Sequence, residues 1–510
     1  MAAKFSTIKK LSILICICSL IAISFGPSMS QAEESQDSML MLWTPIAYPK
    51  AVVFISPTTE QCGNGLEGLL EGRCGQIPFT GLINTLSPCS VDDRVSCIKG
   101  LEIKTANTPW QAATYVGTTS PSGTTWESFP SLDLGPSNDS SIFATTDKSG
   151  KNVLWHTTIS YRISLADIKA GSNGPSQYDI SVKPVKQISA SECVWQNQLE
   201  ALTLIAGSGP DFRNYCYERL GQPSSFNARL VLTLRHEPTG WITSRLQQFG
   251  AQIKKHTDGS GRIDLVLEGM NTVFPVASLT ISNSDADRKE KLCSVDYIAL
   301  TSWRCNNDRS WKGTYLFNTA GSAGEQNKAS FLSLVDVFPE LNQATFDHLS
   351  WSLLINMKKV DQINSCQLPS GIYGVVGGNA MVIDESIPIW DQATQTLEFG
   401  VASPHHLANG QVARGFYELQ LNEQVAKCLW GTKISPTYFS LSVVDENGQS
   451  KVAAATVAVK NGMVIFRATG FTYSSAKLKV SLKKLICVKN GVAKIQAKKA
   501  TTCPKGWKKK

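Results

Sequence analysis

Short runs of β-branched and aromatic residues recur along most of this chain and constrain its fold more than any other feature. Val153–Leu165 and Ala228–Leu234 are two such runs, and polar and apolar residues alternate at the start of Arg262–Leu267, as in a strand with one buried face. Four further runs follow: Ser350–Ile355, Gly371–Val376, Thr396–Val401 and Phe416–Leu421. The best helical stretches, Glu192–Ala206 and Leu421–Leu429, do not exceed about four turns. The pattern predicts an all-β, mainly antiparallel fold.

Asn-Gly pairs mark tight turns in this pattern. Asn461-Gly462 separates two strand-like runs, and Asn490-Gly491 does the same nearer the C-terminus. Both central residues of a type I′ hairpin turn need positive φ, which asparagine and glycine tolerate. We therefore predict a hairpin at each pair, and we expect Tyr438–Val480 to form an antiparallel meander that closes a β-sandwich.

Composition divides the chain into four parts. They are a signal peptide (1–32), an N-terminal β-rich domain (33–285), a C-terminal β-sandwich domain (286–480) and a basic, cysteine-paired hairpin tail (481–510). The main boundary is placed in Ile281–Lys291 because this segment is polar, charged and without periodicity. We expect two sandwich-like domains, with long surface loops between Thr105 and Lys151.

The N-terminal segment has the layout of a secretory signal peptide. Lysines precede Leu11–Phe25, an apolar run too short to span a bilayer comfortably, and small residues at Ser30 and Ala32 predict cleavage between Ala32 and Glu33. A retained membrane anchor is the alternative, which Gly26-Pro27 disfavours because this pair breaks a helix. No later stretch is apolar for about 18 residues. We expect an exported protein, extracellular or at the cell surface, without a transmembrane segment in the mature chain.

The cysteines agree with an oxidising compartment. Twelve of the fourteen lie beyond the signal segment, an even number, and they fall into close couples along the sequence. Spacing alone leaves other connectivities open, but the lowest-order scheme joins neighbours. The predicted disulfides are Cys62–Cys74, Cys89–Cys97, Cys193–Cys216, Cys293–Cys305, Cys366–Cys428 and Cys487–Cys503. A metal site is the rival interpretation, which the absence of Cys-x-x-Cys in the mature chain disfavours. We expect neither a metal nor a cofactor.

Positive charge is concentrated at the C-terminus. Lys477–Lys510 contains twelve lysines and no acidic residue, whereas the body from Glu33 to Ala476 is mildly acidic. Such a tail can simply improve solvation, or it can bind an anionic surface. For an exported protein the relevant polyanions are wall polymers or phospholipid head groups. We therefore predict anionic cell-envelope polymers, and not nucleic acid, as partners of the tail.

The tail also has a recognisable pattern. Cys487-Val-Lys, a lysine-rich middle and Cys503-Pro-Lys-Gly-Trp-Lys resemble a short cysteine-paired C-terminal segment of secreted actinobacterial proteins. Two further stretches, Gly240–Arg245 and Val401–His405, are similar to uncharacterised secreted or cell-surface β-rich proteins of that group. The resemblance implies a cell-surface setting and carries over no catalytic residue.

Catalytic and metal-binding motifs are scarce. The sequence contains no Gly-x-Ser-x-Gly, no His-Glu-x-x-His and no phosphate-cradling glycine loop. Ser474 and Lys477 satisfy Ser-x-x-Lys, but in a strand-rich segment without the companion motifs of penicillin-binding enzymes. His405 and His406 lie on a predicted loop; we interpret them as structural, with metal binding as an alternative that lacks a visible third ligand.

Tryptophan is the most suggestive residue type for ligand binding. Trp110, Trp126 and Trp311 lie in polar, loop-like settings, where an exposed ring can stack on a sugar or simply anchor a loop. Three others stand among apolar neighbours and are predicted to lie in the core: Trp155, Trp351 and Trp430. Carbohydrate is therefore a second candidate partner.

Together these features favour a non-enzymatic protein that acts by binding or display at the cell envelope. The alternative is a secreted hydrolase on a β scaffold that acts on polysaccharide. A cleft with two carboxylates about 5 to 10 Å apart and aromatic walls would favour the enzyme. A shallow aromatic patch or an open sheet edge would favour binding.

The first prediction concerns processing and thiol state. We expect the secreted product to begin at Glu33 and to contain no free thiol, because the signal is followed by an even number of paired cysteines. Mass spectrometry of the alkylated, non-reduced protein should show no labelled cysteine. Two or more fully labelled sites would contradict the pairing scheme.

Overall fold

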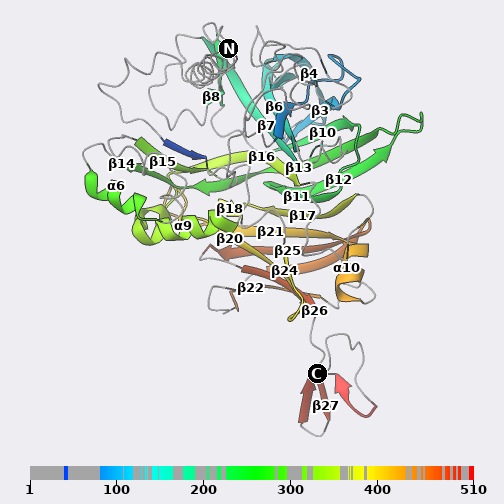
Figure 1. The fold of residues 1–510 in the computed structure, drawn as a ribbon, viewed down its shortest axis with the longest axis vertical. Helices are drawn as coiled ribbons and strands as arrows, with labels where there is room; N and C mark the ends of the chain where they lie inside the picture. Colours follow the sequence, from blue (N-terminus) through cyan, green and yellow to red (C-terminus); the bar gives the residue numbers. More distant parts are fainter. Residues whose placement is uncertain are drawn as a thin grey trace, which may run out of the picture.

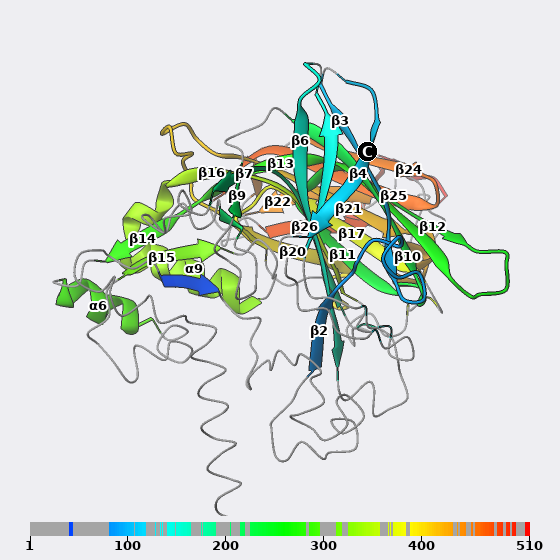
Figure 2. The ribbon, with the colours of Figure 1, turned by 90° about the horizontal axis from the view of Figure 1, so that it is seen from above.

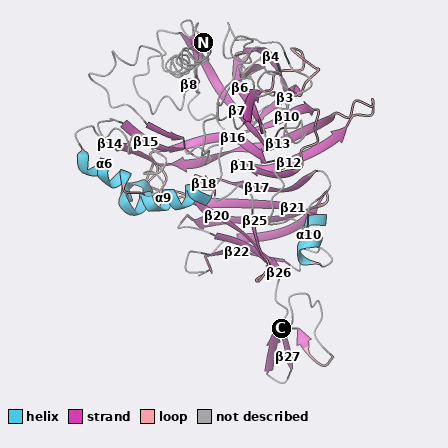
Figure 3. Cartoon of the chain, in the orientation of Figure 1, coloured by secondary structure: helices cyan, strands magenta, loops and turns pink. Residues whose placement is uncertain are grey.

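The computed structural model is built almost entirely of strands, with few short helices (Figure 1, Figure 3). It describes residues 40–43, 81–106, 108–118, 128, 133, 135, 140–147, 149–164, 175, 177–189, 204–205, 215–219, 225–281, 285–295, 313–318, 325–356, 366, 368, 371–383, 388–431, 436, 439–444, 450–451, 454–473, 477–482, 486–489, 492–495 and 505–509. The predicted all-β, mainly antiparallel fold is confirmed. None of the helices among these residues is both long and apolar enough to cross a membrane.

Eight antiparallel strands form a closed ring. Each pairs with the next in the order β13 (Ile263–Val276), β10 (Phe226–Leu234), β3 (Cys97–Thr105), β4 (Gln111–Thr118), β5 (Ser141–Thr146), β6 (Asn152–Ser164), β7 (Gln177–Ser189) and β16 (Phe346–Asn356). The second half of β13 then pairs with the first half of β16 and closes the circuit. A closed sheet leaves these strands with few unpaired edges, which is one way to avoid edge-to-edge association.

The main core fills this ring. Alternate residues of every ring strand point to one side, so Leu230 lies opposite Leu101 on β3 and Leu267 on β13. Ile180 lies between Ile159 and Leu353 in the same way on the far side of the ring. These inward residues belong to one buried cluster, which includes aromatic rings from several strands. The predicted core positions of Trp155 and Trp351 are confirmed, as is that of Trp430 in the other half of the molecule.

The C-terminal half is a sandwich. The large sheet extends from β16 through β11 (Gly240–Ser244), β17 (Ile372–Gly378), β21 (Arg414–Asn422), β25 (Met463–Thr472) and β24 (Ala454–Lys460). A second sheet contains β18 (Val382–Ile383), β19 (Ile389–Asp391), β20 (Thr396–Ala402), β26 (Lys477–Leu482), β22 (Phe439–Val444) and β23 (Ser450–Lys451). Leu419 and Phe466 from the first sheet share a buried cluster with Phe399 and Val480 from the second. The two sheets therefore pack face to face.

Shorter elements complete the fold. Strand β12 (Leu246–Lys255) pairs with β13, and three strands lie beside the ring: β2 (Gly81–Thr85), β8 (Leu204–Ile205) and β9 (Tyr215–Arg219). Two further sheets contain three strands each. One consists of β1 (Leu40–Trp43), β15 (Gly313–Asn318) and β14 (Ser278–Ile281). The other consists of β28 (Val492–Ile495), β27 (Ile486–Lys489) and β29 (Lys508–Lys509).

Four helical segments accompany the strands in the described part of the chain. They are α6 (Ala286–Cys293), α9 (Glu325–Val337), the 3-10 helix η3 (Pro339–Asn342) and α10 (Glu423–Trp430). Helix α10 matches the predicted stretch closely, because Asn422 caps its first turn and Gly431 ends it in the left-handed region. Helix α9 was not predicted, and α6 lies in the segment taken as an irregular boundary. Figure 2 shows α6 and α9 on the side of the molecule opposite β12.

The strand pairing changes three expectations. Strand β16 lies beyond the predicted domain boundary at residue 285, yet it pairs with β13 and β7 from before that boundary. The boundary therefore does not separate two sheets. The N-terminal half, together with β16, forms a ring and not a sandwich. Tyr438–Val480 is not a meander, because β22 pairs with β26 while the β24–β25 hairpin joins the opposite sheet. Leu204 and Ile205 form a strand where a helix was expected, and the preceding part of that stretch lies outside the described residues.

Turn chemistry was predicted correctly at the hairpin between β24 and β25. Asn461 has φ 52° and Gly462 has φ 73°, and the flanking Lys460 and Met463 pair directly. Asn490-Gly491 lies outside the described residues, but β27 and β28 on either side of it pair in the antiparallel sense. The preference of an Asn-Gly pair for a type I′ hairpin turn is therefore met at Asn461-Gly462, the pair that lies within the described residues.

The core of the sandwich provides a stability test. Phe466 is fully buried on β25 and its ring lies 5.4 Å from that of Phe439. We expect Phe466→Ala to lower the free energy of unfolding by about 3–5 kcal/mol, because it leaves a cavity between the two sheets. Val459→Ala on the adjacent, exposed strand should change it by less than ~0.5 kcal/mol. Urea unfolding of both variants checks this, and equal effects would contradict the assignment of this core.

Candidate binding surface

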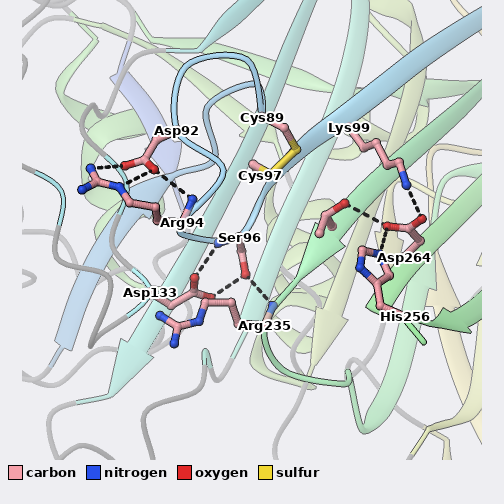
Figure 4. Close-up of a disulfide and its surroundings, with 11 residues drawn as sticks. Cys89, Asp92, Arg94, Ser96, Cys97, Lys99, Asp133, Arg235, His256 and Asp264 are labelled. Carbon is pink, nitrogen blue, oxygen red and sulfur yellow. Dashed lines mark hydrogen bonds and ion pairs between the residues drawn. A yellow bond between two sulfur atoms is a disulfide. The ribbon is translucent and has the colours of Figure 1, made fainter. Parts of the chain in front are cut away.

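A disulfide anchors the loop that leads into β3. Cys89 and Cys97 are bonded, with their Cα atoms 4.9 Å apart (Figure 4). Cys366 is bonded to Cys428, and both bonds agree with the predicted neighbour pairing. Cys293 is also disulfide-bonded. The other predicted cysteines lie in strands whose side chains are not described, Cys216 and Cys487, or outside the described residues, Cys62, Cys74, Cys193, Cys305 and Cys503.

The stapled loop is held by a buried carboxylate. Asp92 accepts hydrogen bonds from the Arg94 backbone N–H at 2.9 Å, from the Arg94 guanidinium at 3.0 Å and from the Ser128 hydroxyl at 2.5 Å. The hydrogen bonds from Arg94 hold the pKa of Asp92 well below its usual range, against the effect of burial. Asp92 is therefore ionised and fully engaged in fixing the loop.

A second carboxylate closes the same end of the ring. Both the backbone N–H and the hydroxyl of Ser96 donate to Asp133 at 2.5 Å (Figure 4), and the Tyr161 hydroxyl donates to the Asp133 carbonyl at 2.6 Å. Asp133 is buried with φ 59°, and burial raises its pKa although the Ser96 hydrogen bonds oppose this. The Ser96 hydroxyl in turn accepts from the Arg235 backbone N–H at 3.0 Å. Because Tyr161 points into the ring, this network connects the stapled loop to the core.

Outside the ring, a polar cluster surrounds Asp264 on β13. Its carboxylate accepts from Lys99 Nζ at 2.6 Å and from Thr233 Oγ1 at 2.8 Å, and lies 2.9 Å from His256 Nε2 (Figure 4). Burial alone would raise the pKa of Asp264, but the hydrogen bonds from Lys99, His256 and Thr233 lower it to about 2. The other ring nitrogen of His256 lies 3.8 Å from Asp258, not beside a serine or threonine hydroxyl. The cluster therefore lacks the geometry of a nucleophile activated by a base.

A second polar cluster lies further along the same strands. Arg229 on β10 donates from Nη1 to Glu102 at 2.6 Å and from Nε to Glu268 at 2.8 Å. Its Cζ atom stands 4.4 Å from the centre of the Trp110 ring. The hydrogen bond to Glu268, followed by the one to Glu102, raises the pKa of Arg229 despite partial burial. One guanidinium thus joins three strands and holds the only predicted ligand-contact tryptophan that falls within the described residues.

Small residues separate the two clusters. Val231 lies opposite Gly100 on β3 and Val266 on β13, in the row between Arg229 and Thr233. No atom lies within 4 Å of the place where a Cβ on Gly100 would stand; the same is true of Gly250 on β12, which lies opposite Glu268 in the Arg229 row. We call this surface the outer face; it comprises Trp110, Glu102, Arg229, Glu268, Gly100, Val231, Val266, Gly250, Lys99, Thr233, Asp264 and His256. It is an open sheet surface on the outside of the ring, and its middle row is uncharged.

Three of the other candidate residues cannot be placed relative to the outer face. Trp126, Trp311 and Ser474 lie outside the described residues. His406 is exposed and is held by backbone hydrogen bonds to Asn342 and Ala344, as a structural role predicts. Within the described ranges, no group of three histidine, cysteine or acidic side chains is placed to hold a metal ion.

Sequence reasoning missed most of this surface. Alternation in Arg262–Leu267 showed that Asp264 and Val266 share one side of a strand, but not which side chains lie across from them. Glu102, Arg229 and Glu268 are widely separated in the sequence, and only the register of β3, β10 and β13 brings them together. Trp110 was found because its neighbours are polar. No protein-family model, curated protein or solved structure matches this chain.

A buried histidine on the ring predicts a pH dependence of stability. Burial, followed by the charge of Lys183, lowers the pKa of His156 to about 3. An unfolded histidine binds its proton near pH ~6.5, so the unfolded state holds more protons between that pH and about 3. Stability should therefore fall as the pH falls through this window, by up to about 1.4 kcal/mol per pH unit from this group.

The test compares His156→Asn with His406→Asn at an exposed position. Urea unfolding between pH 6 and pH 4 should show a shallower loss of stability in His156→Asn than in the parent, while His406→Asn should follow the parent. Identical slopes in all three proteins would contradict the prediction.

Proposed function

We propose that this chain is an exported, non-catalytic binding protein that is retained at the cell envelope by its basic C-terminal tail. The observation that carries the proposal is the small sheet of β27, β28 and β29, which contains lysines and no acidic residue. Lys489, Lys505 and Lys508 in this segment are exposed. The disulfides in the body are compatible with an extracellular setting.

The tail begins later than its charge suggests. Lys477 and Lys479 belong to β26 in the sandwich, where their ammonium groups lie 3.4 Å and 2.6 Å from Glu398. Ten of the twelve C-terminal lysines therefore follow β26. Pairing of β29 with β27 brings Lys508 opposite Val488, so lysines from both ends of the segment are held in one small sheet.

Such an array suits an anionic polymer or lipid surface. Each lysine near an anionic membrane contributes roughly 1 kcal/mol, and the attraction is screened within about 10 Å at ~0.1 M salt. A folded segment keeps its lysines together, which a purely solubilising tag does not require. The resemblance of this tail to those of secreted actinobacterial proteins supports the same envelope setting.

Binding is favoured over hydrolysis by the state of the carboxylates on the outer face. Glu102 and Glu268 are both bound to Arg229, and Asp264 is bound to Lys99. General acid–base catalysis on a glycoside needs one carboxyl group that holds a proton and one that is free to attack or to activate water. Because all three carboxylates are paired with cations, we expect them to contact a ligand and not to act as a catalytic acid or base.

The tail predicts salt-sensitive retention. Replacing Lys489, Lys505 and Lys508 by glutamine should weaken attachment to cells or to anionic vesicles roughly a hundredfold at low salt, because about three lysine contributions are lost. Replacing the same residues by arginine should preserve attachment. At ~1 M salt all forms should be released alike.

Co-sedimentation with cells and with phosphatidylglycerol vesicles measures this effect. Deletion of residues 485–510, which leaves β26 intact, should abolish retention while the body stays folded. Equal retention of the deleted and full-length proteins at low salt would reject the proposal.

A further inference from the structure

We propose that the outer face binds a neutral polysaccharide chain laid across Trp110, Arg229 and the uncharged middle row. This inference rests on the proposed binding role and names the ligand class of the body. The site is separate from the tail, so the two can be tested independently.

Trp110 has a fixed position on the outer face. Arg229 covers part of its indole ring, and Arg229 is itself held from both sides by Glu102 and Glu268. The half-buried indole therefore has a set orientation before any ligand arrives. Pre-organised aromatic side chains contribute more to binding because less conformational entropy is lost. The apolar side of a sugar ring matches such an indole.

The side chains beside Trp110 can form hydrogen bonds with a ligand. The side chains of Arg229, Glu102 and Glu268 remain 32%, 38% and 42% exposed, so a ligand can reach them. A carboxylate accepts at about four lone-pair sites and a guanidinium donates five N–H groups, more than the ion pairs use. Glu102 and Glu268 share the Arg229 guanidinium, which compensates part of their charge, and the remaining donors and acceptors suit neutral hydroxyl groups.

The middle row of the outer face suits an extended ligand. Gly100 leaves open space beside Val231 and Val266, and Gln252 continues this row on β12, so an uncharged band crosses β3, β10, β13 and β12. Four neighbouring strands at ~4.8 Å spacing give this band a length of about 14 Å. Polar clusters border it on both sides, around Arg229 and around Asp264. An extended chain of sugar units fits a band of this form.

Other partners fit less well. A stable protein interface buries about 800 Å² on each side around an apolar centre, whereas the centre here contains two half-buried valines between charged groups. An anionic polymer would meet the carboxylates of Glu102, Glu268 and Asp264. A neutral polysaccharide avoids both difficulties.

Depletion assays on insoluble cellulose, chitin, starch and mannan test the inference with the full-length secreted protein. We expect retention on at least one of these polymers that persists at ~0.5 M salt, where charge attraction is largely screened. Trp110→Ala should weaken this retention at least about tenfold, and Trp110→Phe should restore part of it. Deletion of residues 485–510 should leave it unchanged, which separates this site from the tail.

A second variant keeps the test independent of Trp110. Gly100→Gln places a neutral side chain in the open middle of the outer face without a contact to disturb, and should block the polymer. Ala458→Gln on the exposed strand β24 is the matched control and should bind like the parent. Absence of retention on all four polymers, or equal retention by Gly100→Gln and the parent, would overturn the inference. Retention only at low salt would also overturn it and would indicate an anionic ligand.

Discussion

The pairing of β13 with β16 is the constraint on which the rest of this structure depends. It joins Thr272–Val276 to Phe346–Ser350 and so closes the ring between segments far apart in the chain. Closure assigns an inner and an outer side to every ring strand at once. Leucines and aromatic rings then fill the inside, and the alternating positions must form the outside. The outer face is thus a consequence of how the core closes.

The outer face and the tail sheet differ in how their charges are arranged. On the outer face, Arg229 and Lys99 are paired with carboxylates from neighbouring strands, so most of the charge on this surface is compensated within the sheet. In the tail sheet the lysines have no acidic residue nearby in the sequence. Paired charges interact through short, directional hydrogen bonds, whereas an unpaired array acts through a field that salt screens. One chain can therefore combine specific contact through the body with general attachment through the tail.

The candidate site was only partly accessible to sequence reasoning. Trp110 was identified because an aromatic residue among polar neighbours is unusual in a core. Its partner Arg229 lies more than a hundred residues away and looked like any polar position of an alternating strand. Cross-strand neighbours depend on register, and register is set by the whole sheet. Lys477 and Lys479 show the same limit, because their pairing with Glu398 places them in the sandwich and not in the tail.

The sequence by itself determined the local features of this protein. Strand periodicity, the positive φ of Asn461-Gly462 and the caps of α10 follow from interactions within a few residues. Only the tertiary structure decided that the first half closes into a ring and that the β24–β25 hairpin leaves its sequence neighbours for the opposite sheet. Local conformational energies do not distinguish which strand edges meet; burial of side chains from distant segments in a common core does.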